Sequence, residues 1–249
     1  MNYATKLRII TMVSLLGVSS IGLVQAADTP IVSTGGVAYN IGIPGDSKFT
    51  YSDNVSLGGQ AGTSNGNPYQ NSNDPNAKGN NIAIGRISLN GSSGGANVAL
   101  GSKTFLNGKG DYNFLGNFAA GFNSTISNTI AIGSFAGSGA TGNKNVWLGA
   151  GQAGGSKGNN TVLIGSNSNV NGDFNYGMGH GVIFEGNKNS AIGAYNKIEG
   201  NQSGAFGVGT YNVATVKGDN SYSVGNKNEI GANNTFVMGN NVKTSLDNA

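Results

Sequence analysis

Glycines and apolar residues recur along most of this chain at a fixed spacing. Seven glycines stand seven residues apart, and they are Gly165, Gly172, Gly179, Gly186, Gly193, Gly200 and Gly207. Every second one follows a large apolar residue, as in Ile164-Gly165 and Met178-Gly179. The repeat is therefore fourteen residues long and has two similar halves. A period in this range is typical of a repeat protein, whose units bury their apolar sides by stacking on their neighbours.

The same pattern extends over thirteen units when each is anchored on the glycine that follows the apolar residue. The anchors are Gly42, Gly58, Gly85, Gly101, Gly116, Gly133, Gly149, Gly165, Gly179, Gly193, Gly207, Gly225 and Gly239, spaced 14 to 18 residues apart with one gap of 27. A small residue commonly lies between two large apolar ones before the anchor, as in Ile82-Ala83-Ile84. This alternation predicts a short strand with two different faces.

A second, weaker strand is predicted in the other half of each unit, at Val170, Phe184 and Ile198. Glycine and asparagine crowd between the strands, where they suit turns that need a positive φ. We assign this structural role to the repeat glycines Gly85, Gly101, Gly133, Gly149, Gly165, Gly179, Gly193 and Gly207. No segment after residue 26 shows convincing helical periodicity, so we predict an all-β solenoid of parallel coils of about fourteen residues.

The ends of the chain and one long gap in the repeat set the predicted domains. Residues 1–26 resemble a secretory signal, with a basic start, an apolar stretch and small residues before Ala27. An uncleaved membrane anchor is the alternative. The repeats of 27–232 form the predicted solenoid, in which residues near 59–80 are an inserted loop rich in Asn, Gly, Ser and Pro.

A single fourteen-residue coil buries too few apolar side chains to offset the entropy lost when it is ordered. We therefore expect the chain to oligomerise through the alanine-rich face, where a second backbone can approach closely. Four units carry bulky residues in the small column: Phe114, Trp147, Leu163 and Val237. We interpret them as core filling between subunits, with a hydrophobic receptor patch as the alternative.

Composition narrows the class of protein. The 249 residues include 44 glycines without a Gly-X-Y triplet and no cysteine, which excludes collagen and a disulfide framework. After the predicted signal the chain has twelve basic and eleven acidic residues, a net charge of +1. Charge therefore does not predict nucleic-acid binding.

The pentapeptides N-I-A-I-G (81–85), N-V-A-L-G (97–101), T-I-A-I-G (129–133) and N-S-A-I-G (189–193) resemble the head repeats of YadA-like trimeric autotransporter adhesins. Residues 233–249 are similar to the neck that follows such heads. The resemblance covers about residues 36–249. It implies a left-handed parallel β-roll, assembled as a homotrimer on a bacterial outer surface.

The resemblance further implies attachment to host extracellular matrix proteins such as collagen, or to cell-surface glycoprotein receptors. Family members continue into a coiled-coil stalk and a membrane-anchored barrel, whereas this sequence stops at Ala249 without heptads or barrel strands. We expect either a fragment or an anchor on another chain. Tyr69 and Lys78, in and beside the inserted loop, are the candidate ligand-binding residues. The alternative is that the loop is an ordinary disordered spur that binds no ligand.

The residues provide no catalytic or metal-binding pattern, so we predict no enzyme activity, cofactor or metal. His180 is the sole histidine and no phosphate-binding loop is present. Glu185 and Glu199 are expected to stack on successive coils, with Lys188 and Lys197 relieving their repulsion. A structural surface solenoid, including an ice-binding one, and a β-solenoid enzyme acting on carbohydrates or transferring acyl groups are the alternatives to an adhesin. Threonine ladders, clustered acids and a catalytic histidine, which would favour these alternatives, are lacking.

Overall fold

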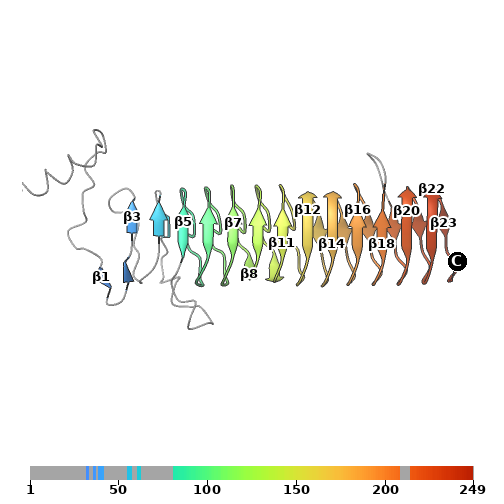
Figure 1. Ribbon diagram of the computed structural model, residues 1–249, viewed down its shortest axis with the longest axis horizontal. Coiled ribbons are helices and arrows are strands. Elements are labelled where there is room, and N and C mark those ends of the chain that lie inside the picture. Colours follow the sequence, from blue (N-terminus) through green and yellow to red (C-terminus); the bar gives the residue numbers. More distant parts are fainter. Residues whose placement is uncertain are drawn as a thin grey trace, which may run out of the picture. The chain divides into compact units, whose positions relative to one another are not determined.

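The computed structural model describes strand residues 32–33, 36–37, 39–41 and 55–57, followed by residues 61–62, 81–207 and 214–248. The predicted signal (residues 1–26) and the candidate ligand residues Tyr69 and Lys78 lie outside these ranges. Within them the chain contains strands and no α-helix, and successive coils stack as a parallel β-solenoid (Figure 1). Accordingly, no helix of the described part has the length and apolar character needed to span a membrane.

One parallel sheet runs along the whole stack and contains 13 strands, one from each coil. Each strand pairs with its equivalent in the next coil, so that residues at one position form a column along the stack. The strands are β3 (Tyr39–Ile41), β4 (Val55–Leu57), β5 (Ile82–Ile84), β6 (Val98–Leu100), β7 (Phe114–Gly116), β9 (Ile130–Ile132), β11 (Val146–Leu148), β12 (Val162–Ser166), β14 (Tyr176–His180), β16 (Ser190–Ile192), β18 (Gly204–Phe206), β20 (Tyr222–Asn226) and β22 (Phe236–Asn240).

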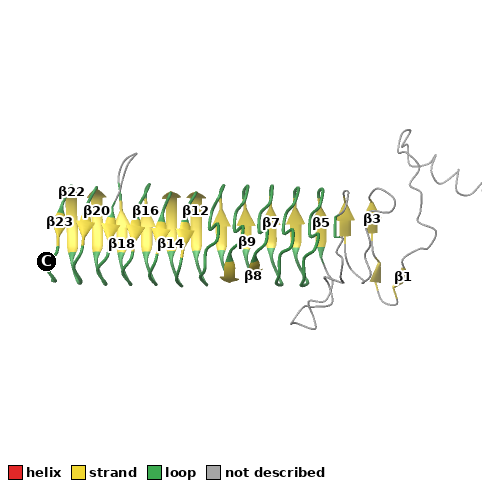
Figure 2. Cartoon of the chain, turned by 180° about the vertical axis from the view of Figure 1, so that it is seen from behind, coloured by secondary structure: helices red, strands yellow, loops and turns green. Residues whose placement is uncertain are grey.

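Three smaller sheets complete the structure. A six-stranded parallel sheet accompanies the later coils, and it consists of β13 (Asn169–Val170), β15 (Ile183–Phe184), β17 (Lys197–Ile198), β19 (Thr215–Val216), β21 (Glu229–Ile230) and β23 (Lys243–Thr244). The earlier coils have the parallel pair β8 (Thr125–Ser127) and β10 (Thr141–Asn143) instead. The strands β1 (Val32–Ser33) and β2 (Gly36–Val37) pair with each other antiparallel. Figure 2 shows β8 apart from the row of strands that contains β7 and β9.

The register changes along the stack. Val98 pairs with Phe114 and Val146 with Val162, an offset of 16 residues, whereas Val162 pairs with Tyr176, an offset of 14. This pairing corrects one anchor of the sequence alignment. Gly116 pairs with Leu100 and Ile132, so it stands in a strand column and not at the turn. The turn position there is Asn117, whose φ of 81° is the left-handed conformation that asparagine tolerates.

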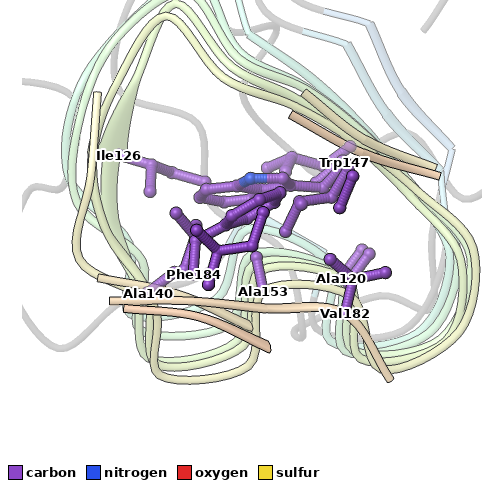
Figure 3. Packing of buried hydrophobic residues seen from close by; sticks show 14 of the residues in the cluster. Ala120, Ile126, Ala140, Trp147, Ala153, Val182 and Phe184 are labelled. Atoms are coloured by element: carbon purple, nitrogen blue, oxygen red, sulfur yellow. The ribbon is translucent and has the colours of Figure 1, made fainter. Parts of the chain in front are cut away.

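The small column of the large sheet points into the coil. Ala83, Ala99 and Ala131 are fully buried there, so the prediction that this alanine-rich face contacts another subunit is wrong. A coil this thin leaves room only for small side chains wherever the opposite wall is close. Trp147 and Leu163 occupy the same column and are also fully buried within their own chain. Figure 3 shows Trp147 among the other buried apolar side chains. They fill the core of one subunit and not a space between subunits.

The interior also contains a ladder of polar side chains, one just before each strand of the large sheet. Its described members are Asn81, Asn97, Asn113, Thr129, Asn145, Thr161, Asn175, Asn189, Ser203, Ser221 and Thr235, all of them buried. Asn175 shows the typical pattern: its Nδ2 donates to the carbonyl of Gly186 at 2.8 Å, and its Oδ1 accepts the backbone N–H of Asn189 at 2.9 Å. The ladder therefore satisfies backbone groups that the turns leave unpaired inside the coil.

The repeat glycines form a corner column at the end of each strand. Gly149 has a φ of 121°, and a Cβ there would run into the carbonyl oxygen of Gly165 in the next coil. Positive φ is likewise found at Gly85, Gly101, Gly133, Gly165, Gly179 and Gly193. The amide of Gly207 donates to the carbonyl of Ile192 at 2.8 Å. Both the dihedral angle and the close approach of two backbones therefore require glycine at this corner.

The predicted domain limits can be compared with the stack where residues are described. Ala61 is fully buried and the amide of Gly62 donates to the carbonyl of Ser88 at 2.7 Å, so these two residues belong to a coil. The remainder of the predicted insertion lies outside the described residues. Residues 233–248, which resemble a neck, continue the solenoid, since β22 pairs with β20 and β23 with β21.

Candidate interaction face

The outer side of the 13-stranded sheet carries two columns of large apolar side chains. Because successive residues of a strand point to opposite faces, the residues that flank each buried alanine point outward. We call this surface, from β5 to β22, the apolar face. Its first column is Ile82, Val98, Phe114, Ile130, Val146, Val162, Tyr176, Ser190, Gly204, Tyr222 and Phe236, and its second is Ile84, Leu100, Gly116, Ile132, Leu148, Ile164, Met178, Ile192, Phe206, Val224 and Met238.

The exposure of these side chains is unusual for apolar residues. Met178 is 51% and Ile192 50% exposed, although each lies on a strand that is paired on both sides. Met238, on the terminal strand β22, is 71% exposed. Isolated exposed apolar residues are normal on a protein surface, but a contiguous apolar patch marks an interaction surface. The parallel register makes the two columns continuous, so this face fits that description.

Gly116, Ser190 and Gly204 interrupt the columns of large apolar side chains. At Gly204 the interruption leaves no gap. A Cβ at Gly204 would lie 2.8 Å from Cε2 of Phe206 and 2.9 Å from Cδ1 of Tyr222. The aromatic rings of these two residues therefore lean over the glycine, which is itself buried. As a result the apolar surface continues across β18.

An aromatic cluster lies at the turn next to the apolar face. The rings of Phe118 and Phe135 meet edge to face with their centroids 5.3 Å apart, and Nζ of Lys103 lies 5.8 Å from the centroid of Phe118. Both rings are exposed, at 39% and 48%. They widen the apolar surface at the coils of β7 and β9.

The six-stranded sheet presents charged side chains instead. Lys197 Nζ lies 2.7 Å from Glu199 and 3.4 Å from Glu185, while Lys243 lies 2.9 Å from Glu229. The hydrogen bond from Lys197 lowers the pKa of Glu199, and the bond to Glu199 raises the pKa of Lys197. Lys243 lowers the pKa of Glu229 in the same way. One lysine thus relieves the repulsion of both stacked glutamates; Lys188, which we expected to share that role, forms no ion pair among the described residues.

His180 ends β14 at a corner of the coil. Its Nδ1 lies 2.7 Å from the Oγ of Ser166, one coil earlier, and its ring meets Tyr195 edge to face at 5.0 Å. The described residues contain no group of three histidine, aspartate or glutamate side chains arranged to hold a metal ion. The contacts of His180 therefore continue the stacking between coils.

The sequence pattern contained the signal for the apolar face, but we interpreted its direction wrongly. Large–small–large triplets predict that each strand has two different faces, but they do not determine which face points into the coil. In the structure the predicted repeat glycines border this face, since Gly179 follows Met178 and Gly193 follows Ile192. The deciding clue was the small size of the middle residue in most units, because the opposite wall of the coil is close there and leaves room only for a small side chain.

Comparisons with known proteins do not place the chain in a family. No protein-family model matches it, and the search of curated proteins found no sequence with significant similarity.

Proposed function

We propose that the chain is the head of a bacterial surface adhesin, a homotrimer of left-handed parallel β-rolls built from coils of about fourteen residues. The observation that carries the proposal is the apolar face, which runs from β5 to β22 and is not covered by any of the residues that the structure describes. The pentapeptide repeats support it, because they resemble those of YadA-like heads. Three such faces turned toward one another exclude water from side chains such as Ile192 and Met178.

The repetition of similar coils along the head explains how such a protein attaches to a host. A regular stack presents similar polar edges at each coil, and a trimer presents each of them three times. Weak contacts to a repetitive matrix protein such as collagen, or to cell-surface glycoproteins, then gain strength through avidity. In this proposal the head is exported and stands on the outer surface of the bacterium.

Two measurements on the purified protein test the proposal. Sedimentation equilibrium should give a mass of three chains, and the assembled protein should bind immobilised collagen or epithelial cells. A folded monomer at micromolar concentration would refute the trimer. A trimer that binds no matrix protein and no cell would favour the alternative of a structural surface protein without a specific ligand.

A further inference from the structure

The strands β8 and β10 form a separate polar surface on the earlier coils. Their outward residues Thr125 and Thr141 pair directly with each other. Single bridges extend this column to Lys109 on one side and Lys157 on the other. All four side chains are exposed. We call this column, with Ser127 and Asn143 beside it, the lysine–threonine face.

The two lysines of this face are not neutralised by neighbouring carboxylates. Lys109 and Lys157 form no ion pair with any residue that the structure describes. The closest acids in the sequence serve another purpose: Asp111 accepts the backbone N–H of Gly95 at 2.7 Å, and Asp173 accepts that of Asn159 at 2.7 Å. By contrast, Lys197 and Lys243 on the six-stranded sheet are both paired with glutamates.

The charge of the stack changes sign where the coils shorten. Residues 81–161 contain five cationic side chains and one carboxylate, a net charge of +4. The described residues from 162 to 248 contain five lysines and six carboxylates, a net charge of −1. The charge within the lysine–threonine column changes in the same way. Lys157 pairs with Asn171 in the next coil, and the position of Asn171 is taken by Glu185 one coil later. The charge distribution therefore favours an anion over the earlier coils and disfavours it beyond Asn171.

From this arrangement we propose that the lysine–threonine face binds a linear sulfated polysaccharide. The lysines lie three coils apart, about 14 Å at the spacing of neighbouring strands. The threonine hydroxyls and the amide of Asn143 between them supply hydrogen-bond donors to sulfate and hydroxyl oxygens. A chain that lies along the stack can therefore reach both cations and the donors between them.

Other polyanions fit this surface less well. Proteins that hold single-stranded nucleic acid stack its bases on aromatic side chains, and the outward residues of β8, β10 and the flanking bridges are only Lys, Thr, Ser and Asn. A helix or sheet that lies on an anionic membrane inserts apolar side chains beside its cations, and this column has none. A hydrated, sulfated sugar chain needs neither aromatic nor apolar contacts.

This inference names a ligand class for the proposed adhesin and rests on that function only for the biological source of the sugar. The direct test measures binding of the purified protein to heparin, as the sulfated probe, at physiological salt. The double variant Lys109→Gln/Lys157→Gln should bind at least about tenfold more weakly, because each lysine near a dense anionic surface contributes a several-fold factor. Its matched control is Lys188→Gln/Lys227→Gln, which removes the same charge at exposed corners elsewhere and should bind like the parent.

Each other result overturns the proposal. These results are no binding of the parent protein to heparin, equal losses in both double variants, or equal binding to desulfated heparin. Tighter binding to single-stranded DNA or to phosphatidylserine vesicles would assign the face to those partners instead. Circular dichroism confirms that the variants remain folded. Cell attachment is measured separately: if it persists while heparin binding is absent, the adhesin proposal stands and this one fails.

Discussion

Gly137 lies directly against the indole ring of Trp147, and a Cβ on the glycine would come within 2.6 Å of Cε3. Trp147 occupies the column that holds alanine in other coils, so the extra volume of its ring is accommodated by a missing side chain on the facing wall. A related compensation is found at Gly177, the partner of Leu163 in the next coil. A Cβ there would come within 2.9 Å of Leu163 in the same column and within 2.9 Å of Phe184 on the six-stranded sheet. Large side chains are thus accommodated by glycines beside them or opposite them.

The first prediction is that Gly137→Ala strongly destabilises the fold. The added methyl group forces the indole of Trp147 from its position, and the φ of 66° is unfavourable for alanine. Overpacking and the left-handed conformation together should cost roughly 2–5 kcal/mol. Thermal or urea unfolding, monitored by circular dichroism and by tryptophan fluorescence, measures the loss.

Gly155→Ala is the matched control for this prediction. Gly155 has a similar φ of 70°, but no atom lies within 4 Å of an added Cβ. Its replacement should therefore cost only the conformational penalty, about 1–2 kcal/mol. Equal losses in the two variants would show that the indole is not packed against Gly137 as described.

The contacts of Gly137 and Gly177 also show which features of the fold could not be predicted from the sequence. The residue types of Ile192 and Gly193 are enough to predict a strand and the corner that ends it. The alternation of large and small residues and the choice of glycine at a turn both depend on local structure. The inward direction of Ala191 depends on how far away the opposite wall is, which is a property of the folded coil. Similarly, Phe105 and Ile87 adopt φ values of 53° and 60°, a conformation that their side chains disfavour and that no sequence rule predicts. Phe105 is held there by the hydrogen bond from its backbone N–H to the carbonyl of Ala120 in the next coil, at 2.8 Å.

The second prediction concerns the buried polar ladder. Replacement of Asn175 by leucine removes the acceptor of the Asn189 N–H and the donor to the Gly186 carbonyl. Two buried backbone groups then lack partners, which should cost roughly 2–5 kcal/mol. Asn187→Ala provides the comparison, because Asn187 makes an equivalent bond to the Asp173 N–H at 2.8 Å but is exposed. Its loss should be about 1 kcal/mol, since water replaces the missing partner.

Urea unfolding of the two asparagine variants measures the loss in the free energy of unfolding. Amide hydrogen exchange at Asn189 provides a local measurement, since this N–H should exchange faster in the leucine variant than in the parent. If Asn175→Leu and Asn187→Ala proved equally stable, the internal ladder would not be a source of stability. The sequence showed the abundance of asparagine but not its division into a buried and an exposed column, because both columns follow the same turn chemistry.

The third prediction tests the apolar face. Ile192→Asp places a charge among side chains that the proposed trimer buries, and burying an unpaired carboxylate is costly. The variant should sediment as a monomer and remain folded, because Ile192 is 50% exposed in the single chain. Ile183→Asp is the control, since this isoleucine is 37% exposed on the six-stranded sheet and should leave the assembly intact. Unchanged assembly of Ile192→Asp would exclude the apolar face as the subunit contact.

The fourth prediction is that the ion pairs of the six-stranded sheet stabilise the fold in a defined range of pH. The pKa of Glu199 and that of Glu229 are lowered below their ordinary value of 4.5, so their contribution is present above that pH and is lost as the pH falls through the lowered values. The pKa of Lys197 is raised above 10.5, so its contribution is complete below that pH and is lost as the pH rises through the raised value. Because these groups are partly exposed to solvent, the effect should be small and should weaken with added salt.

Thermal melting of the parent protein and of the variant Glu185→Gln/Glu199→Gln/Glu229→Gln measures this contribution. At pH 7 and low salt the parent should melt at the higher temperature, because the variant has lost the partners of Lys197 and Lys243. At pH 3 the difference should shrink, since protonation of the glutamates removes the same charges from the parent. A difference that is unaffected by both acid and salt would mean that the glutamates stabilise the sheet by packing and not by their charge.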